Sequence, residues 1–594
     1  MTTRTPLRPL ARILDARAKG ENPDVIEAEN IRSRHEVMRD RARVRAESRL
    51  LILVAGFCVG FALIGIRMAE MAAATPEEPR VVTAGRGIQA QRADILDRNG
   101  HVLATNMVTH ALYAHPRDMV DPARAARELV RIFPDMSEDR LLRQFTGGGA
   151  FHWLRRKLSP EQVQAVHDIG EPGLLFGPRE MRLYPNGRLA AHVLGGSRFG
   201  DEAVHSAEVI GVAGLEKALD DRLRDPARLD DPLQLSIDLP VQAAVAEVLH
   251  SGMKLLNAKG AAAVIMDARN GEIISMVSLP DFDPNDRPLP PTSGDPGDSP
   301  IFNRALQGVY ELGSVMKVFP VAQALELGLV NPATMINSSS PMQMGRYRIR
   351  DFKNYGPQLS VTDVIVKSSN VGTARIAAQV GPLRQQAFLK ELGFLDPVQV
   401  ELIEALKARP MVPKKWSEIS AATVSYGHGL AASPMHLATA YAALVNGGTK
   451  LTPTLIKGGS AQGAQVMSRR TSDQMRTMLR QVVIKGTAKM AEVPGYVIGG
   501  KTGTADKQKP GGGYHKDKVM ANFAGAFPMN DPRYVIVVSL DEPVETSGTE
   551  ARRTAGWTAV PVTAEILRRV GPLLGLRPQA IEADLPSKVT AVRN

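Results

Sequence analysis

The feature that most constrains this chain is a run of seventeen residues without a charge, residues 50–66. A run of this length is at the short end for a membrane-spanning helix, and Arg67 can extend its side chain to the far headgroups. Segments on the two sides of such a helix cannot share a hydrophobic core. We therefore expect a transmembrane helix at 50–67, with a short part before it and a large folded part after it.

Charge on the two sides of the run predicts its orientation. Residues 1–49 carry twelve Lys or Arg against eight Asp or Glu, whereas Glu70, Glu77 and Glu78 follow the run. Because basic residues stay on the cytoplasmic side, we expect a cytoplasmic N-terminus. Nothing in residues 1–49 is typical of a packed core, so we expect a flexible tail there.

Two other interpretations of the run stay open. Residues 72–74 resemble a signal-peptidase site, although the part before the run is unusually long for a cleaved signal peptide. A buried core helix is the second alternative, and the charge asymmetry argues against it. An uncleaved anchor is favoured.

Composition excludes several classes of function. The formal net charge is +11, but aromatic residues are only 5% and no zinc-knuckle or RNA-binding signature is present. We expect no nucleic-acid partner; a basic chain also suits an acidic polymer or a membrane surface. Cys58 is the single cysteine and no His-Glu-x-x-His motif occurs, so we expect no disulfide, no metal and no cofactor.

Patterning after the run predicts a first region at 87–232, preceded by a linker at 75–86. It opens with apolar segments on both sides of Asn99-Gly100, which is typical of a β-hairpin. We interpret this region as a structural domain of mixed α and β type, because none of its motifs indicates a chemical function. Helical patterns in it lie at about 122–132, 137–145 and 160–168.

A second region is predicted at 233–572, followed by a loose tail at 573–594. A helix is expected at about 240–254. Strands are expected at 261–267 and 272–277, on either side of the turn residues Asn270-Gly271. Residues 280–300 are rich in Pro, Asp and Gly, so they form a loop.

Ser314 and Lys317 lie where that loop enters an apolar helical pattern at 315–327. The spacing places Ser314 at a helix start and Lys317 one turn later on the same face. A lysine amine can take the serine proton if burial or a second cation lowers its pKa. Alone, the pair is better explained by a capping serine and a solvated lysine.

Ser368 and Asn370 stand two residues apart in a second polar motif, within 367–372. A hydroxyl beside a nucleophile can relay its proton, and a carboxamide can hold a substrate amide with one donor and one acceptor. A polar turn or helix cap is the alternative.

Lys501, Thr502, Gly503 and Thr504 form a third motif. Residues 495–502 also fit a phosphate-loop pattern, but that loop needs a helix directly after its Lys-Thr. Here the glycine-rich segment 506–513 follows, so we reject a nucleotide site. We expect a strand with a close backbone approach at Gly503, where the lysine and the hydroxyls suit a substrate carboxylate.

Ser-x-x-Lys, Ser-x-Asn and Lys-Thr-Gly in this order are the signature of penicillin-binding proteins and serine β-lactamases. The chain resembles the class B penicillin-binding proteins, most of all their division-specific transpeptidases, from the anchor to about residue 570. Residues 92–104, 182–185 and 214–216 resemble motifs of their pedestal, and 425–429, 521–528 and 541–543 resemble segments that flank their active site.

The resemblance implies an α+β fold: a transpeptidase domain of the serine β-lactamase type with an antiparallel sheet flanked by helices, at 233–572. A mixed pedestal domain of the dimerisation type at 87–232 and one transmembrane helix would precede it. It also implies cross-linking of peptidoglycan, in which Ser314 attacks a D-Ala-D-Ala bond and β-lactams acylate the same serine.

The same resemblance assigns a role to each site residue. Lys317 would be the base in acylation, and Ser368 and Lys501 would relay the proton to the leaving amine. Asn370 would hold the peptide amide. Thr502 and Thr504, on either side of Gly503, would bind the terminal carboxylate.

The sequence departs from the family pattern at three positions. Leu312 stands where members often have Pro, and we expect little effect on the nucleophile. Ser369 replaces the Asp usual in β-lactamases, which favours a penicillin-binding protein. Pro320 should kink its helix or remove one backbone bond.

No Glu can be placed as a deacylating base, so β-lactamase activity is disfavoured. The loop 506–518 is predicted to be mobile.

Localisation and partners are expectations from the resemblance. The catalytic domain would be periplasmic, held to the inner membrane by a single span and placed at the division septum. Peptidoglycan strands with D-Ala-D-Ala stem peptides, β-lactams, a glycan polymerase and other division proteins would be its partners. A lateral-wall enzyme, a carboxypeptidase or β-lactamase, and a sensor that only binds stay open as alternatives.

Overall fold

The computed structural model describes residues 8–73, 92–199, 209–459, 463–509 and 511–579. The chain divides into two compact units, Met1–Gly87 and Ile88–Asn594. Each unit is described by itself below. The predicted linker at 75–86 and the end of the predicted tail, 580–594, lie outside the described residues.

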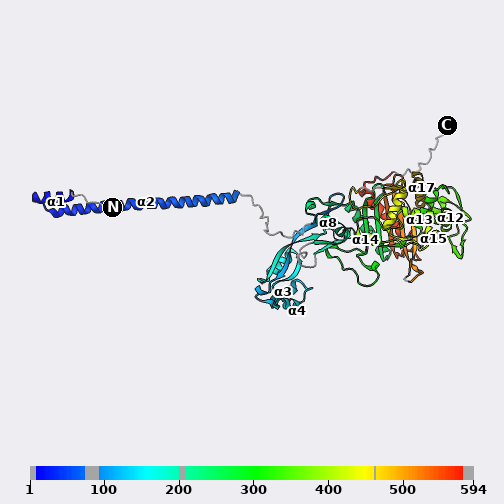
Figure 1. The fold of residues 1–594 in the computed structure, drawn as a ribbon, viewed down its shortest axis with the longest axis horizontal. Helices are drawn as coiled ribbons and strands as arrows, with labels where there is room; N and C mark the ends of the chain where they lie inside the picture. The colour runs from blue at the N-terminus through cyan, green and yellow to red at the C-terminus, as the bar shows by residue number, and fades with distance from the viewer. Residues whose placement is uncertain (1–7, 74–91, 200–208, 460–462, 510, 580–594) are drawn as a thin grey trace, which may run out of the picture. The chain divides into compact units, whose positions relative to one another are not determined.

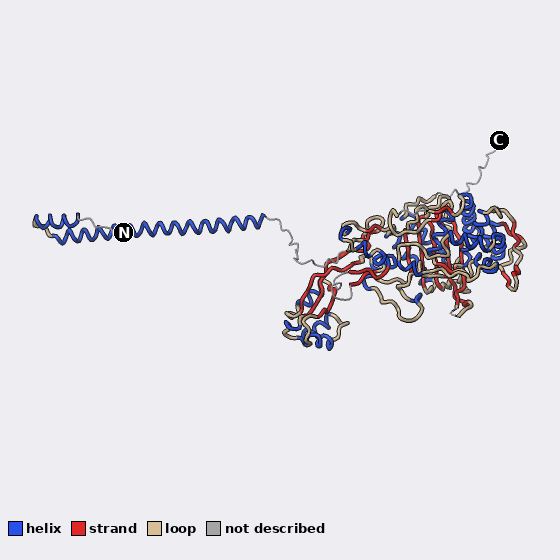
Figure 2. Tube along the Cα trace, in the orientation of Figure 1, coloured by secondary structure: helices blue, strands red, loops and turns tan. Residues whose placement is uncertain are grey.

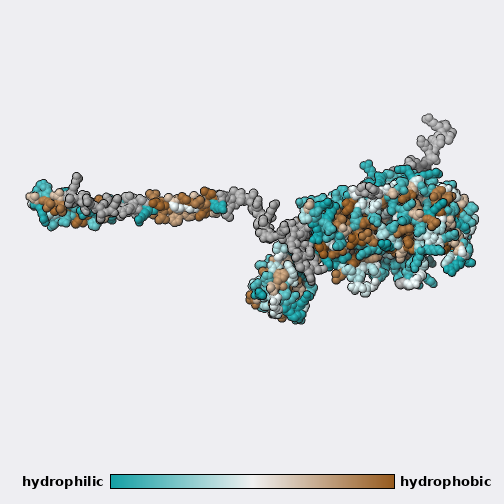
Figure 3. All heavy atoms as spheres, in the orientation of Figure 1, coloured by the Kyte–Doolittle hydropathy of each residue, from teal (hydrophilic) through white to brown (hydrophobic). Residues whose placement is uncertain are grey.

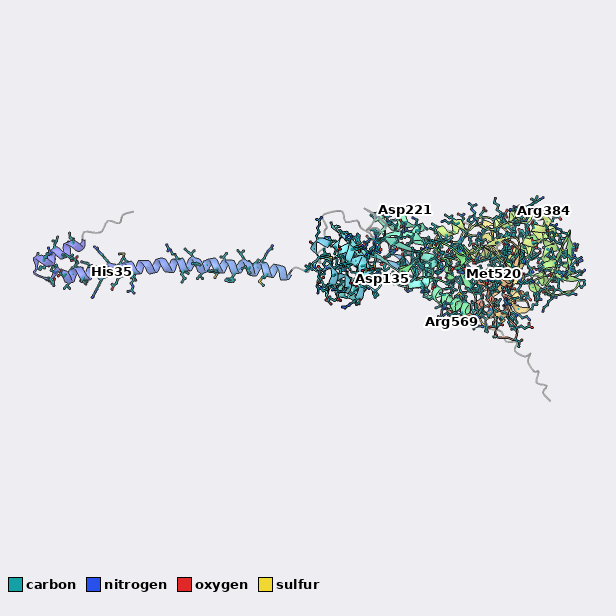
Figure 4. All side chains as sticks on the ribbon, turned by 90° about the horizontal axis from the view of Figure 1, so that it is seen from below. His35, Asp135, Asp221, Arg384, Met520 and Arg569 are labelled. Atoms are coloured by element: carbon teal, nitrogen blue, oxygen red, sulfur yellow. The ribbon has the colours of Figure 1, made fainter. Side chains whose placement is uncertain are left out.

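The first unit consists of two helices, α1 (Arg8–Ala18) and α2 (Pro23–Ala73). Figure 2 shows α1 lying back along the start of α2. The predicted apolar helix is present, because residues Arg49–Met68 of α2 are long and apolar enough to cross a membrane. None of that segment is buried, which argues against a core helix. Figure 3 shows it as a largely brown band, and in Figure 4 the side chains drawn on α2 project from both visible edges of the helix.

The flexible tail predicted for residues 1–49 is wrong for the part that the structure describes, because that part is helical. Its Arg, Glu, Ala and Met residues are strong helix formers, and Asp15 pairs with Lys19 at 3.2 Å one turn later. The start of α2 also continues directly into the apolar segment, so helix formation there does not need a separate nucleation step. In this segment the absence of a hydrophobic core does not prevent helix formation.

The pedestal region is built on a sheet of order β3-β2-β1-β7, with β4 also paired to β2. The predicted hairpin is confirmed: β1 and β2 are antiparallel, and Gly100 in the turn has a φ of +92°. The three predicted helices are confirmed as well, and α3 and α4 lie together at one end of the region (Figure 1). The bounds are β1 (Ile95–Leu96), β2 (Val102–Ala114), α3 (Pro122–Ile132), α4 (Glu138–Thr146), β3 (His152–Leu158), α5 (Pro160–His167), β4 (Leu174–Leu183), α6 (Ala191–Leu194), β5 (Gly196–Phe199), β6 (Val209–Ala213), α7 (Gly214–Ala218), α8 (Asp220–Leu223) and β7 (Leu233–Gln234).

A buried group of charges joins the pedestal segments to which the sequence assigned no chemistry. Arg92 lies 2.7 Å from the Glu216 carboxylate and 2.6 Å from Asp220, and Arg182 lies 2.7 Å from Glu216. The side chains of both arginines and of Glu216 are almost fully buried. Because a buried charge without a partner is costly, these residues stabilise the pedestal as a set.

The second region contains a five-stranded antiparallel sheet of order β18-β19-β20-β8-β9, as the resemblance implied. The predicted strand pair is confirmed as β8 (Gly260–Asp267) and β9 (Ile273–Leu279). Every residue of β8 and β20 is buried, so both faces of the sheet are covered. Helices α9 (Leu239–Leu255) and α18 (Ala559–Leu573) pack together on one face, and α16 (Pro434–Val445) packs on the other.

The remaining elements surround this sheet. They are β10 (Tyr310–Glu311), the 3-10 helix η7 (Gly313–Lys317), α10 (Val318–Glu326), β11 (Met335–Asn337), β12 (Met342–Met344), β13 (Tyr347–Ile349), β14 (Gln358–Ser360), α11 (Val361–Lys367), α12 (Asn370–Val380), α13 (Pro382–Glu391), α14 (Ile403–Lys407), α15 (Glu418–Ser425), β15 (Ala431–Ala432), β16 (Thr449–Lys450), β17 (Ala464–Gln465), α17 (Arg469–Lys485), η8 (Lys489–Ala491), β18 (Gly499–Gln508), β19 (Tyr514–Phe527) and β20 (Tyr534–Asp541).

The predicted boundary at residue 233 falls inside shared structure. Strand β7 begins there and pairs in parallel with β1 of the pedestal. The Asn285 side chain donates to the Tyr184 carbonyl at 2.9 Å, and the Gln242 side chain donates to the Leu189 carbonyl at 3.0 Å. The pedestal and the second region therefore belong to one compact unit.

Removing Glu216 should cost the pedestal much more stability than removing an exposed glutamate. Glu216→Ala leaves Arg92 and Arg182 buried without their shared partner, so we expect the free energy of unfolding to fall by about 3–5 kcal/mol. Glu128→Ala is the matched control, because Glu128 pairs with Arg131 on the surface at 2.8 Å. Its loss should cost less than about 1 kcal/mol in thermal or urea unfolding. Equal losses for the two variants would contradict the assignment.

Candidate active site

The nucleophile turn carries Ser314 and Lys317 on η7, which runs directly into α10. The sequence predicted one helix from 315 to 327; the structure divides it into a 3-10 turn and an α-helix. Pro320 lies in the first turn of α10, directly after η7, so its missing N–H removes at most one backbone hydrogen bond at the junction of the two elements. Lys317 reaches the interior from this turn and is fully buried.

The Lys-Thr-Gly motif lies on β18, in a continuous antiparallel pairing with β19, which confirms the predicted strand and excludes the phosphate loop. Gly503 allows the nucleophile turn to lie against this strand, because a Cβ there would come 2.4 Å from the Leu312 carbonyl oxygen. Gly313 has a φ of +67°, and a Cβ on it would come 2.6 Å from the Thr504 carbonyl oxygen. Two glycines therefore set the distance between the turn and the strand.

The Ser-x-Asn motif lies in the turn between α11 and α12. Ser368 ends α11 in the left-handed conformation with a φ of +61°, and the Ser369 side chain caps α12. A positive φ at a serine is costly and is held here by its surroundings. The Ser368 hydroxyl accepts from Lys317 Nζ at 3.1 Å and from Lys501 Nζ at 3.0 Å. One hydroxyl thus lies between two lysine amines.

Both amines are held by backbone carbonyls as well. Lys317 Nζ donates to the Ser368 carbonyl at 2.5 Å, and Lys501 Nζ donates to the Thr502 carbonyl at 2.9 Å. Neither lysine side chain is exposed to solvent. The lysines therefore have fixed positions and little freedom to leave the site.

Burial lowers the pKa of both lysines, and repulsion by a neighbouring charge adds to the shift of Lys317. Burial lowers the pKa of Lys317 well below its ordinary value, the charge on Lys501 lowers it further, and Asp351 opposes the shift. Burial lowers the pKa of Lys501 to about 7. A lysine with a lowered pKa is uncharged part of the time near neutral pH, and it can then accept a proton.

These groups meet in a cleft of about 600 Å³. Six of the eight predicted site residues line it: Ser314, Lys317, Ser368, Asn370, Thr502 and Thr504. The other two lie behind its wall, where Lys501 reaches Ser368 and Gly503 packs against the nucleophile turn. The sequence missed other lining residues, including Phe352, Tyr355, Thr487, Lys489 and Trp557, because they belong to segments without a motif.

Asp351 is a site residue that the sequence analysis did not find. Its carboxylate accepts from the Ser369 hydroxyl at 2.7 Å and from the backbone N–H groups of Asn370 and Val371 at 2.5 and 3.0 Å. The negative charge lies at the N-terminus of α12, where the helix dipole stabilises it. Asp351 therefore holds the turn that carries Ser368, although nothing in the local sequence connects it to the motif.

Glu311, three residues before Ser314, collects donors from two other segments. Its buried carboxylate accepts from the Gly429 N–H at 2.7 Å, from Gln508 at 2.9 Å and from the Tyr514 hydroxyl at 3.1 Å, and it lies 3.2 Å from His428 Nδ1. Burial raises the pKa of Glu311, but the contacts with His428, Gly429 and Tyr514 outweigh this effect, so the pKa is lowered. The nucleophile turn is thereby tied to segment 425–429 and to the β18–β19 hairpin.

The segment 506–518, predicted as a loop, is largely a continuation of that hairpin, with Asp506 opposite Val519 and Gln508 opposite Tyr514. Its mobility stays a prediction. Among the described residues, no group of three or more His, Cys, Asp or Glu side chains is placed to hold a metal ion.

The fold and the site together define a serine acyl-transfer domain of the penicillin-binding type. The penicillin binding protein transpeptidase domain matches residues 261–567, and the penicillin-binding protein dimerisation domain matches residues 87–226. The chain belongs to the class B penicillin-binding proteins.

Two relatives and one solved structure place the chain within this family. It is 35% identical to the probable peptidoglycan D,D-transpeptidase FtsI of Caulobacter vibrioides, over 92% of each chain. It is 32% identical to the probable peptidoglycan D,D-transpeptidase PenA of Neisseria gonorrhoeae, over 77% of this chain and 81% of that one. The crystal structure of penicillin binding protein 3 from Mycobacterium tuberculosis, complexed with aztreonam, matches with a TM-score of 0.62 and 26% identity, over 83% of this chain and 99% of that one.

Replacing Lys501 should change the pH dependence of stability. The folded chain has a Lys501 pKa of about 7, against an ordinary value of 10.5. Between these values the unfolded state binds a proton that the folded state does not, so wild-type stability rises with pH across this window. Lys501→Met removes that slope, so its Tm relative to wild type should be higher at about pH 6 than at about pH 9.

The control for this measurement is Lys485→Met, which changes an exposed lysine on α17. Its Tm relative to wild type should not depend on pH. If the Lys501→Met difference is the same at both pH values, the lysine titrates normally and the lowered pKa is wrong.

Proposed function

We propose that the chain is a peptidoglycan D,D-transpeptidase that works through an acyl-enzyme on Ser314. The observation that carries the proposal is the Ser368 hydroxyl held between two buried lysine amines, beside the cleft that Ser314 lines. Such an arrangement can remove a proton from a serine and deliver it to a leaving group. The names of the relatives support the same reaction.

The first half of the reaction forms an ester on Ser314. Ser314 Oγ attacks the carbonyl carbon of the penultimate D-Ala, and its proton passes to the uncharged amine of Lys317. The developing oxyanion would be stabilised by the backbone N–H groups of Ser314 and Thr504, whose segments lie against each other. The bond to the terminal D-Ala then breaks, and Ser368 with Lys501 delivers the proton to its amine.

The second half transfers the acyl group to an amine of a neighbouring strand. The amine attacks the ester carbon, loses a proton through the same lysines, and the bond to Ser314 Oγ breaks. The new peptide bond is the cross-link, and the serine is regenerated. No external oxidant, metal or cofactor is needed for either half.

Binding of the donor peptide is assigned to the motif residues around the cleft. Asn370 donates one amide hydrogen to the Arg350 carbonyl at 2.9 Å, which orients its carboxamide for a peptide amide. Thr502 and Thr504 line the cleft beside the charge of Lys501, so they suit the terminal carboxylate. β-Lactams would occupy the same positions and leave a stable ester on Ser314.

A β-lactamase with a carboxylate base would need an Asp or Glu that activates water for hydrolysis of the ester. The residues that line the cleft include no Asp or Glu, which disfavours this alternative. Fast turnover of penicillin by the full-length protein would favour a β-lactamase, and release of D-Ala from a stem peptide without cross-linking would favour a carboxypeptidase. A sensor that only binds would be favoured if a Ser314→Ala chain still supported growth and division.

We further propose that the protein is anchored in the inner membrane and cross-links peptidoglycan at the division septum. The apolar helix Arg49–Met68 supports a single-pass anchor, and the basic residues before it support a cytoplasmic N-terminus and a periplasmic catalytic domain. A membrane glycan polymerase and other division proteins would then be its partners. A fluorescent fusion in dividing cells tests this: septal enrichment supports it, and signal confined to the lateral wall contradicts it.

Labelling by a fluorescent penicillin should depend on Ser314 alone among the serines. Ser314→Ala removes the hydroxyl that forms the ester, so covalent labelling should be lost. Ser339→Ala is the matched control, because Ser339 is exposed and does not line the cleft, and it should label like wild type. Persistent labelling of Ser314→Ala at another residue would refute the proposed nucleophile.

A further inference from the structure

A basic strip extends from the cleft onto the hairpin of β12 and β13. It consists of Arg346, Arg348, Arg350 and Lys353, and all four side chains are exposed. Between residues 338 and 362 the only carboxylate in the sequence is Asp351. Asp351 already accepts three hydrogen bonds from the Ser369 to Val371 turn. The strip therefore carries positive charge that its own segment does not neutralise.

Within the described part of the chain, no other segment neutralises the positive charge of the strip either. None of the four side chains lies within ion-pair distance of a described carboxylate. Arg346 donates to the Tyr347 hydroxyl at 3.0 Å, and Arg348 donates to the Gln343 side chain at 3.3 Å. Both contacts leave the guanidinium charges uncompensated, so the groups are able to bind anions.

The hairpin is held in place by a small hydrophobic cluster of its own. Met342 and Ile349, which are opposite each other in the β12–β13 pair, are buried against Val371, Ala374 and Ala422. Val371 and Ala374 belong to α12, the helix that begins at Asn370. The strip is therefore presented by an anchored element, at a fixed place relative to the Ser-x-Asn turn.

The strip is continuous with the cleft. Phe352 and Tyr355, on either side of Lys353 in the chain, both line the cleft with Ser314. The Arg350 carbonyl holds the side chain of Asn370 at 2.9 Å. Lys367 and Lys489 also line the cleft, so its rim is cationic as well. A ligand that leaves the cleft along this wall passes over cations.

From this continuity we infer that the basic strip binds the free carboxylates of peptidoglycan stem peptides beyond the D-Ala-D-Ala end that enters the cleft. The inference rests on the proposed function, since it takes a peptidoglycan strand as the ligand. Stem peptides carry carboxylates along their length, and guanidinium groups pair with carboxylates in a bidentate manner. The strip would hold a strand across the edge of the cleft and favour long, acidic strands over short peptides.

The test compares the full-length protein with two triple variants of equal charge change. The strip variant is Arg346→Gln, Arg348→Gln and Lys353→Gln, which leaves the anchoring residues and Arg350 in place. The control variant is Arg384→Gln, Arg577→Gln and Lys254→Gln, three exposed residues outside the strip and the cleft lining; Arg384 is labelled in Figure 4. Each protein is tested for acylation by benzylpenicillin and for binding to uncross-linked peptidoglycan strands.

Acylation by benzylpenicillin reports on the cleft alone. We expect both variants to be acylated within about twofold of the wild-type rate, because the strip residues themselves do not line the cleft. If the wild-type protein is not acylated at all, the proposed function fails, and strand binding still decides the present inference by itself.

Binding to strands reports on the strip. At low ionic strength the strip variant should bind native strands about tenfold more weakly than wild type, as expected for three exposed charge pairs, and the difference should shrink as salt is added. The control variant should bind within about twofold of wild type. Strands in which amides replace all free carboxylates except those of the terminal D-Ala should bind wild type about as weakly as native strands bind the strip variant.

Two results would overturn the inference. The first is equal binding of native strands by the strip and control variants, which would mean that the strip serves some other partner. The second is an equal loss of affinity for wild type and strip variant when the strand carboxylates are converted to amides. That result would place the carboxylate contacts elsewhere on the protein.

Discussion

Two lysine amines buried on either side of one serine hydroxyl are the constraint on which the site depends. Lys317 and Lys501 are both shielded from water and both hydrogen-bonded to Ser368. Two ammonium groups so close to a shared partner repel each other, and burial penalises each charge. The site therefore favours a state in which at least one amine is uncharged. That uncharged amine is what a serine nucleophile needs, so the chemistry follows from an arrangement that is unfavourable for stability.

The fold keeps this arrangement in place with contacts from distant segments. Two glycines allow the nucleophile turn to lie against β18, where a side chain at Gly313 or Gly503 would meet backbone atoms. Asp351 holds the turn that carries Ser368, and Glu311 ties the nucleophile turn to segment 425–429 and to Gln508 and Tyr514. The central sheet, buried on both faces, supports these segments. Rigid support of this kind is what makes a fixed proton pathway possible.

The sequence predicted the elements whose signals are local. Turn residues predicted the hairpins at Gly100 and Gly271. Motif spacing predicted eight site residues, of which six line one cleft and the other two, Lys501 and Gly503, pack directly behind its wall. It did not find Asp351 or the donors to Glu311, because these contacts join residues far apart in the chain and involve residue types that are common everywhere. The helical start of α2 was missed for a different reason. Intrinsic propensity and continuity with an apolar helix can form a helix without any packed core.

The most direct test of this account is a measurement of the charge state of the two lysines. Nuclear magnetic resonance of protein labelled with ¹³C at lysine Cε follows each amine through its titration, and Lys317→Met and Lys501→Met assign the two signals. We expect Lys501 to titrate with a pKa of about 7 and the pKa of Lys317 to lie well below 10.5. Two signals that both titrate near 10.5 would show that neither lysine is uncharged at neutral pH, and would contradict the account.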